Sequence, residues 1–176
     1  MKYFILLFFA TLMIGGGAAY HYLGFSQPVT ITTANQGPFQ MIFKDHIGPY
    51  HEIMEAIEEV EKWAKASGVE CINSVGEYID DPEVVDHDRL RSRGGCIVQQ
   101  VPAEIPKQFG SETIPNKEYL VATFDGAPSI GPFKVYPKVK NHLQASHLKS
   151  TGSVYEIYEV RDVNKLRTTY LFSTSP

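Results

Sequence analysis

The stretch that decides the fold is HIGPYHEIMEAIEEVEKWAKASG, residues 46–68. A strand ends at its first residues, Gly48-Pro49 forms a turn, and apolar side chains then recur at the three- and four-residue spacing of an amphipathic helix. We expect this helix to run from about Tyr50 to Ser67 and to stop at Gly68, because glycine is common just past the last helical turn. Its inward-facing residues are Ile53, Ile57, Val60 and Ala64. Such a helix can cover an active site, frame a ligand cleft or simply pack against a core.

The same order of elements occurs twice along the chain. The first helix follows a strand at 39–46 and precedes strand-like runs at 69–79 and 94–101. In the second half a strand at 119–124 is followed by a helix from Tyr136 to Leu148, with Pro137 in its first turn, and by strands at 154–160 and 166–172. The sequence therefore predicts an α+β fold built from a duplicated β-α-β-β repeat. We expect an antiparallel sheet with the helices packed on one side and a cleft between the halves.

Length and charge limit the possible classes of protein. The 176 residues suit one domain with its own core, which we place at 28–176, with Gln27–Pro38 as a polar tether into the first strand. The chain has 16 basic and 20 acidic residues, a net charge of -4, and no run of basic residues. A surface that binds the phosphate backbone needs clustered positive charge, so we predict no nucleic-acid partner.

The N-terminal segment is the most apolar part of the chain. Residues 3–25 carry no charge and are numerous enough to cross a bilayer as a helix, so we predict that 1–27 is a single-pass membrane anchor. The alternative is a cleaved signal segment, with Phe4 to Ile14 as its apolar core and Gly17-Ala18-Ala19 near the cleavage site. Because Lys2 precedes the apolar run, we expect the domain on the non-cytoplasmic side, in the periplasm or its equivalent.

The two cysteines, Cys71 and Cys96, are too far apart in the sequence for a CxxC motif, which argues against a zinc site or a redox motif. If the strands around them form a hairpin centred near Val85, the two residues lie about four positions out of register, and a disulfide requires close Cα atoms. An oxidising compartment would still allow a bridge. From the register we predict two free, buried thiols.

The strand VYEIYEV, residues 154–160, carries one glutamate on each face. One face consists of Val154, Glu156, Tyr158 and Val160, and the other of Tyr155, Ile157 and Glu159. A glutamate among apolar neighbours is unfavourable unless it is paired, bonded to phenols or protonated, and such carboxylates often mark functional sites. Periodicity leaves open which glutamate faces inward, and a solvated edge strand is the alternative.

Other residues with possible chemistry give weaker signals. The aromatic residues could line a pocket for a flat or cationic molecule, although such residues also fill ordinary cores; they are Tyr50, Trp63, Tyr78, Tyr119, Tyr136, Tyr155 and Tyr158. His142 and His147 are five residues apart, which does not place both rings on one helical face, and we predict neither a metal site nor a cofactor. Motifs for acyl transfer, nucleotide binding and zinc proteolysis are absent from the sequence.

Four short stretches carry a resemblance to a known family: HIGPYHEI at 46–53, YIDDP at 78–82, YLVATFDGAP at 119–128 and YEIYEV at 155–160. In this order they resemble the GyrI-like small-molecule-binding domain, the effector-binding domain of AraC- and MerR-type regulators, over about residues 28–174. The apolar segment before it is similar to the arrangement in a testis-expressed receptor for selective autophagy of the endoplasmic reticulum. The chain has no helix-turn-helix segment, so we do not expect transcriptional control, and we do not transfer the autophagy role.

The resemblance implies a cleft between the halves, with Glu156 of the E-x-Y motif at its base. Tyr158 follows this glutamate in the motif, and we expect Tyr50, Trp63 and Tyr78 to form walls. The function that we predict is a membrane-tethered module that binds an aromatic or cationic small molecule, rather than an enzyme. The alternatives are a hydrolase that uses Glu156 as general base, and a protein-interaction module without a ligand, whose partner the sequence does not identify.

Overall fold

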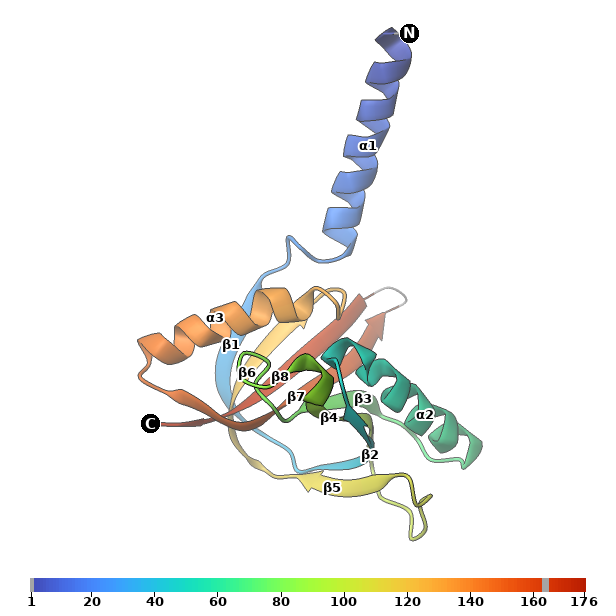
Figure 1. Cartoon of the computed structure of the whole chain (residues 1–176), viewed down its shortest axis with the longest axis vertical. Helices are drawn as coiled ribbons and strands as arrows, with labels where there is room; N and C mark the ends of the chain where they lie inside the picture. The colour runs from blue at the N-terminus through green and yellow to red at the C-terminus, as the bar shows by residue number, and fades with distance from the viewer. Residues whose placement is uncertain (1, 163–164) are drawn as a thin grey trace.

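The computed structural model describes residues 2–162 and 165–176, which form one curved antiparallel sheet and three helices (Figure 1). The strands are ordered β1-β6-β8-β7-β3-β4-β2-β5 across the sheet. Their bounds are β1 Val29–Gln36, β2 Phe39–Ile47, β3 Asn73–Tyr78, β4 Arg91–Val98, β5 Gly110–Ile114, β6 Lys117–Asp125, β7 Lys149–Asp162 and β8 Lys165–Ser175. The helices are α1 Lys2–Tyr22, α2 Ile53–Ala66 and α3 Gly131–Ala145, with single 3-10 turns at Tyr50–Glu52 and His87–Arg89. The predicted α+β class is confirmed.

The sheet consists of two equivalent halves that meet at its centre. One half is β3-β4-β2-β5 and the other is β7-β8-β6-β1, so each strand order matches the other outward from the seam. At the seam β3 pairs antiparallel with β7, and Gly76 lies opposite Glu156. The predicted β-α-β-β repeat is therefore present, and the seam is the site where its two copies are joined.

The outermost strands are exchanged between the halves. Strand β1 precedes the first repeat in sequence but pairs with β6 of the second, and β5 precedes the second repeat but pairs with β2 of the first. The predicted tether at 27–38 is therefore mostly strand β1, and β5 lies between the predicted strands at 94–101 and 119–124, where no strand was expected. The β1–β2 connection passes close to the β5–β6 connection, because a Cβ atom at Gly37 would lie 2.9 Å from the carbonyl oxygen of Pro115. Only glycine fits this approach and the positive φ of 89°.

The core is divided between the two faces of the sheet. The concave face without helices buries one cluster, which comprises Met41, Phe43, Val75, Ile97, Ile114, Tyr119, Val121, Tyr155, Ile157 and Leu171. On the opposite face, α2 covers a cluster around Ile42 and Cys96, and α3 covers a second cluster around Phe124 and Phe172. The curvature of the sheet lets its concave side fill with its own side chains, so the helices are needed on one face only.

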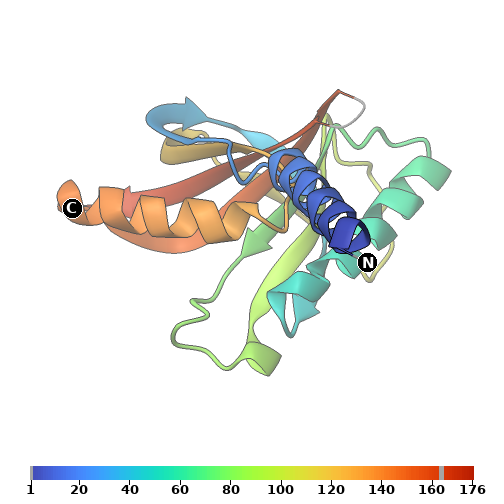
Figure 2. The same ribbon diagram turned by 90° about the horizontal axis from the view of Figure 1, so that it is seen from above.

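Helix α2 packs directly on the backbone of the sheet. The residues predicted to face inward are all buried, and Val60 and Ala64 have no exposed surface. The helix comes this close because β4 has a glycine beneath it. A Cβ atom at Gly94 would lie 2.8 Å from Cγ1 of Ile57 and 3.0 Å from the carbonyl oxygen of Ile53. Figure 2 shows α2 and α3 on the same side of the sheet, as the sequence predicts.

Helix α3 begins at Gly131, five residues before the predicted start at Tyr136. Pro132 occupies the first turn of the helix, where its missing N–H is harmless. Pro137 therefore lies inside the helix and not in its first turn, which corrects the prediction. Pro137 has no N–H to donate to the carbonyl oxygen of Phe133 one turn earlier. Both residues are exposed, so water can bind this carbonyl group instead.

Helix α1 projects away from the rest of the protein (Figure 1). Its apolar side chains are exposed, Tyr3 and Phe4 by 82% each. They are concentrated before Ile14, and the second half of the helix contains three consecutive glycines and His21. Among the described residues no helix is both long enough and apolar enough to cross a membrane. The predicted single-pass anchor and the non-cytoplasmic location that depended on it are therefore wrong, whereas the alternative of a cleaved signal segment stays a prediction.

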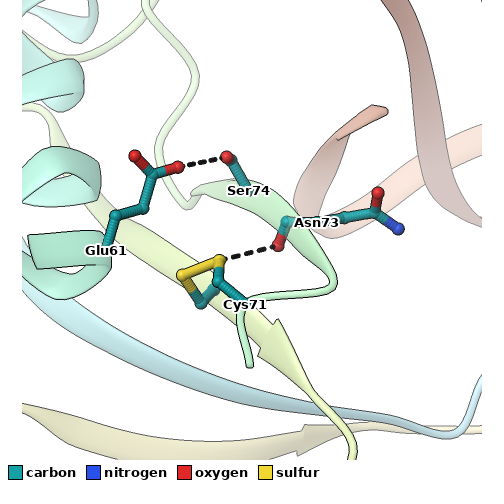
Figure 3. The surroundings of a disulfide bond; sticks show 5 residues. Glu61, Cys71, Asn73 and Ser74 are labelled. Atoms are coloured by element: carbon teal, nitrogen blue, oxygen red, sulfur yellow. Dashed lines mark hydrogen bonds between the residues drawn. A yellow bond between two sulfur atoms is a disulfide. The ribbon is translucent and has the colours of Figure 1, made fainter. Parts of the chain in front are cut away.

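Cys71 and Cys96 form a disulfide bond, with their Cα atoms 5.3 Å apart, so the prediction of free thiols is wrong (Figure 3). The error came from the assumed start of the strand. Strand β3 begins at Asn73, and its residue Ser74 lies opposite Cys96. Cys71 precedes the strand, and its backbone does not continue the strand pairing, which brings it next to Cys96.

Candidate functional site

Glu156 lies in the middle of β7 with only 2% of its surface exposed. It faces the side of the sheet that carries the helices, as its pairing partners Gly76 on β3 and Tyr170 on β8 do. Both edges of β7 are paired, which excludes the solvated edge strand, and the burial of the side chains decides the choice that periodicity left open. Glu156, and not Glu159, is the buried glutamate.

Three phenols enclose the carboxylate of Glu156. The hydroxyl of Tyr136 on α3 donates to Oε1 at 2.9 Å, and the hydroxyl of Tyr158 donates to Oε2 at 3.2 Å. Tyr158 and Tyr78 of β3 share a further hydrogen bond of 3.0 Å between their hydroxyls. Both halves of the molecule therefore contribute to one set of hydrogen bonds, which we call the tyrosine cage (Tyr78, Tyr136, Tyr158 and Glu156).

Burial dominates the electrostatics of the cage. Loss of solvent raises the pKa of Glu156 to about 7, although the hydrogen bonds from Tyr136 and Tyr158 oppose this shift. Burial, reinforced by the negative charge of Glu156, raises the pKa of Tyr136 and Tyr158 well above the usual value. The phenols are therefore proton donors at neutral pH, and the carboxyl group changes charge near pH 7.

Gly76 allows Tyr78 to reach the cage. A side chain at position 76 would crowd the ring of Tyr78, because its Cβ atom would lie 3.1 Å from Cε2. Without it the ring extends toward β7, where its hydroxyl meets that of Tyr158. Because Gly76 has no side chain, the ring of Tyr78, two residues further along β3, can occupy the space beside it.

Tyr50 connects the cage to the surface. Its ring contacts Tyr78 edge-on, with centroids 4.9 Å apart, and its hydroxyl donates to the carbonyl oxygen of Asp80 at 2.6 Å. It also lines a hollow of about 420 Å³ between the turn before α2 and the β3–β4 loop. The lining residues are Pro49, Tyr50, His51, Pro82, His87 and Leu90. The start of the stretch 46–68 therefore frames a hollow, one aromatic ring away from the cage.

The β3–β4 loop lies on the same side of the sheet as the helices (Figure 2). Asp80 at its start forms a paired contact with Arg91 at its end, with an Nη2 to Oδ1 distance of 2.7 Å. Glu83 at its tip is 3.0 Å from Nζ of Lys140 on α3. The loop thus links the two halves above the hollow.

Trp63 is the predicted site residue that the structure places elsewhere. It packs against Phe109, with ring centroids 5.5 Å apart, in the cluster beneath α2 that includes Cys96. Tyr50, Tyr78 and Tyr158 do lie together near Glu156. The sequence indicated Tyr136 only as one of several aromatic residues. What distinguishes it is its contact with Glu156, and this contact depends on how α3 packs over β7.

Three hydroxyl groups on the same face are buried without a hydrogen-bond partner among the described residues. They belong to Ser92, Thr168 and Tyr170. Each lies directly across a strand pair from a cage residue: Ser92 from Tyr78, Thr168 from Tyr158, and Tyr170 from Glu156. A buried polar group without a partner is unfavourable, so the surroundings of the cage have unused capacity for hydrogen bonds.

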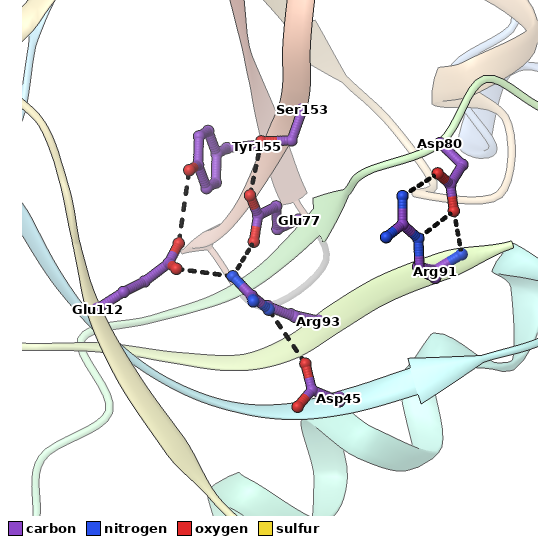
Figure 4. A network of polar contacts seen from close by, with 8 residues as sticks. All are labelled: Asp45, Glu77, Asp80, Arg91, Arg93, Glu112, Ser153 and Tyr155. Carbon is purple, nitrogen blue, oxygen red and sulfur yellow. Dashed lines mark hydrogen bonds and ion pairs between the residues drawn. The ribbon is translucent and has the colours of Figure 1, made fainter.

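A second polar cluster lies on the concave face (Figure 4). Arg93 contacts three carboxylates, Asp45 through Nε at 3.0 Å and Glu77 and Glu112 through Nη1 at 3.2 and 2.7 Å. Ser153 donates to Glu77 at 2.6 Å. Burial and the charge of Glu77 raise the pKa of Glu112. This network joins β2, β3, β4, β5 and β7 across the seam and faces away from the tyrosine cage.

Comparison with known sequences identifies one family. The family model described as the GyrI-like small molecule binding domain matches residues 27–173. A protein described as DNA gyrase inhibitor, from Pectobacterium carotovorum subsp. carotovorum (strain PC1), is 32% identical over 78 residues, which are 43% of this chain. The chain spans about half, 51%, of the length of that relative.

Solved structures share the fold at low sequence identity. The C-terminal domain of EcmrR has a TM-score of 0.65 at 14% identity, and the match covers 84% of this chain and 98% of that domain. EcmrR in a complex with DNA has a TM-score of 0.67 at 11% identity, with coverage of 99% and 69%. SAV2435 bound to tetraphenylphosphonium has a TM-score of 0.53 at 11% identity, with coverage of 82% and 94%. The absence of a nucleic-acid partner stays a prediction.

Proposed function

Because the chain belongs to the GyrI-like small-molecule-binding family, we propose that it binds an aromatic cation at the seam between α2 and α3. The observation that carries the proposal is Glu156, a carboxylate that is 2% exposed and bonded to phenols from two elements. No lysine or arginine is hydrogen-bonded or ion-paired to it among the described contacts. A bound cation would supply the charge that the fold leaves out.

The charge state of Glu156 sets the expected preference. A carboxyl group with a pKa of about 7 is only partly ionised at neutral pH. A cation at the site favours the ionised form, so binding releases a proton, and affinity should fall by up to about tenfold per pH unit below 7. A neutral ligand lacks this dependence.

The hollow at Tyr50 supports a route and a place for the aromatic part of the ligand. Its lining is largely apolar, and Tyr50 in this lining contacts Tyr78 of the cage edge to face. Aromatic faces attract cations by about 0.5–2 kcal/mol each. Tyr136 bonds to Glu156 in the place that a ligand cation would take, so binding requires the Tyr136 side chain to move. The tetraphenylphosphonium bound by SAV2435, which shares the fold, belongs to the same chemical class.

A hydrolase is the second candidate, favoured by one observation. A carboxyl group with a pKa of about 7 is well matched to general base catalysis at neutral pH. Both oxygens of Glu156 already accept hydrogen bonds from tyrosines, so a water molecule would have to displace one of them. Turnover of a reactive ester that is lost in Glu156→Gln would support this candidate.

The binding proposal is tested by thermal shift of the full chain at pH 8. Tetraphenylphosphonium is the probe, and triphenylphosphine oxide is its neutral aromatic counterpart. At a cation concentration of about 100 times Kd the midpoint should rise by about 5–10 °C, because binding adds about 2.7 kcal/mol to stability. The neutral compound should give a much smaller shift.

Two variants identify the group that responds. Glu156→Gln should lose the preference for the cation, whereas Glu159→Gln, on the same strand and paired with Arg161 at the surface, should keep it. Equal shifts in wild type and Glu156→Gln would remove Glu156 from the site. No shift across a library of aromatic cations would contradict the proposal and favour the interaction module.

A further inference from the structure

A group of side chains with metal-donor atoms lies beside the second half of α2, outside the tyrosine cage. Glu61 on α2, Cys71 before β3 and Cys96 on β4 each offer one donor atom, and these atoms all lie within 4.8 Å of one another. Figure 3 shows Glu61 and the disulfide side by side, with Ser74 bonded to the carboxylate of Glu61. Three separate segments thus place two sulfur atoms and a carboxylate around one point.

The surroundings accommodate the reduced form of the cysteines. Sγ of Cys71 is 3.7 Å from the carbonyl oxygen of Asn73, which can accept the hydrogen bond of a free thiol. Cys71 and Glu61 are partly exposed, so a reductant and a metal ion can reach them, while Cys96 is fully buried. Two residues of the cluster beneath α2, Val60 and Trp63, come from the same helix as Glu61, so this helix holds the carboxylate in place without the disulfide.

Reduction leaves two thiols beside a carboxylate, and a metal ion allows both thiols to ionise there. Two thiolates and one carboxylate within 4.8 Å would repel one another in a site that is partly shielded from water. Thiolate sulfur selects soft or borderline cations such as Zn²⁺, which bind Cys at about 2.3 Å and carboxylate oxygen at about 2.0–2.2 Å. Separate sulfur atoms and a nearby carboxylate are the donor set of a three-ligand site with one position open to water.

We propose that Glu61, Cys71 and Cys96 form a zinc site that is present only when the disulfide is reduced. Two molecules of an external thiol supply two electrons and two protons, become one disulfide themselves, and leave Cys71 and Cys96 as thiols. Zn²⁺ then binds both sulfur atoms and releases their protons, while Glu61 provides the third ligand. The hydroxyl of Ser74 holds the Glu61 carboxylate toward the cysteines. The same three residues therefore have two exclusive states, a covalent bridge and a metal complex.

The test uses the full chain, reduced with a phosphine that is removed before titration under argon. Co²⁺ is the first probe, because cobalt bound to thiolates absorbs strongly in the near ultraviolet. Reduced protein should bind one Co²⁺ per chain with this absorption, and Zn²⁺ should displace it. The oxidised protein should show no such band. Emission from Trp63, the single tryptophan, provides a second readout because its ring lies in the same cluster as both cysteines.

Variants separate a built site from binding to cysteines alone. Cys71→Ser should abolish the absorption band, and Glu61→Gln should weaken Co²⁺ binding by about 10–100-fold. Glu58→Gln is the matched control, because Glu58 lies on the exposed side of α2 and pairs with Lys62 at 3.1 Å. Circular dichroism of each reduced variant verifies that it is folded. The proposal is overturned if reduced wild type gives no band, or if Glu61→Gln binds Co²⁺ as tightly as wild type does.

Discussion

The two halves of the molecule share one topology but attach their helices in different ways. Helix α2 packs with aliphatic side chains onto Gly94, and its polar contacts with the sheet, Glu61 to Ser74 and Glu59 to Lys44, do not involve Glu156. Helix α3 places Tyr136 over Glu156, so a hydrogen bond to a buried carboxylate is part of its packing. One copy of the repeat thus provides a rigid frame, and the other provides a site whose stability depends on protonation.

The largest expected difference between the halves is the pH dependence of Glu156. Its pKa rises from 4.5 in the unfolded chain to about 7 in the folded protein, so the folded state holds the proton more tightly. Stability from this group is fully present below pH 4.5 and is lost as the pH rises through 7, which amounts to about 3 kcal/mol. Urea unfolding at pH 5 and pH 8 should show this decrease in wild type and a smaller one in Glu156→Gln.

Glu159→Gln is the matched control for this pH series, because Glu159 lies at the surface and pairs with Arg161. It should retain the pH dependence of wild type. If Glu156→Gln also retained it, another group would be responsible, and the contrast between the two helices would lose its electrostatic part.

Overpacking beneath α2 tests the rigid half. Gly94→Ala adds a Cβ atom 2.8 Å from Ile57 and 3.0 Å from the backbone of α2, so the helix must move outward. We expect a loss of about 2–3 kcal/mol in the free energy of unfolding, independent of pH. The control is Gly152→Ala, which meets no atom within 4 Å but has φ +69°, and should cost about 1 kcal/mol. An equal cost for the two variants would show that α2 is not tightly seated.

Removal of one hydroxyl group tests the polar contact of α3. Tyr136→Phe deletes a donor to Glu156 and should cost about 2 kcal/mol at pH 8, and less at pH 5, where the carboxyl group is protonated. Tyr50→Phe is the counterpart in the other half, because its hydroxyl bonds to the backbone of Asp80. Its cost of about 1 kcal/mol should not change with pH. The same pH dependence in both variants would contradict the assigned role of Tyr136.

The smallest effect is expected at the link between the halves. Lys140 and Glu83 are both largely exposed, with side chains 60% and 73% accessible, so their ion pair should contribute less than about 0.5 kcal/mol. Lys140→Met should leave unfolding in 1 M salt unchanged relative to wild type, because salt screens the pair. A loss of more than about 1 kcal/mol would show that the loop is a structural clamp between the halves.

Much of the fold could be predicted from local patterns. The periodicity of Ile53, Ile57 and Val60 and the stop at Gly68 predicted the first helix, although α2 begins three residues after the predicted start because Tyr50–Glu52 form a 3-10 turn. The second helix was predicted five residues too late, since Gly131-Pro132 fits both a turn and a first helical turn. Strand β5 was missed because it has five residues and lies between Pro106 and Pro115.

The candidate site was predicted in part. Glu156 and its neighbour Tyr158 came from one strand and one family resemblance, and Tyr78 and Tyr50 lie close to them in the structure. Trp63 lies apart from them, in the cluster beneath α2, because a helical face does not reveal which end of the sheet it meets. Tyr136 could not be selected among ten tyrosines, since its contact with Glu156 spans 20 residues and two elements.

The sequence by itself determined the repeat, the helix that begins after Gly48-Pro49, and the presence of a glutamate on each face of the strand at 154–160. These features follow from periodicity and turn residues, which act over a few positions along the chain. Only the tertiary structure decided which glutamate is buried, which edge strands are exchanged, and that Cys71 meets Cys96. Those outcomes depend on pairing between distant segments, where a shift of one residue turns every side chain to the opposite face.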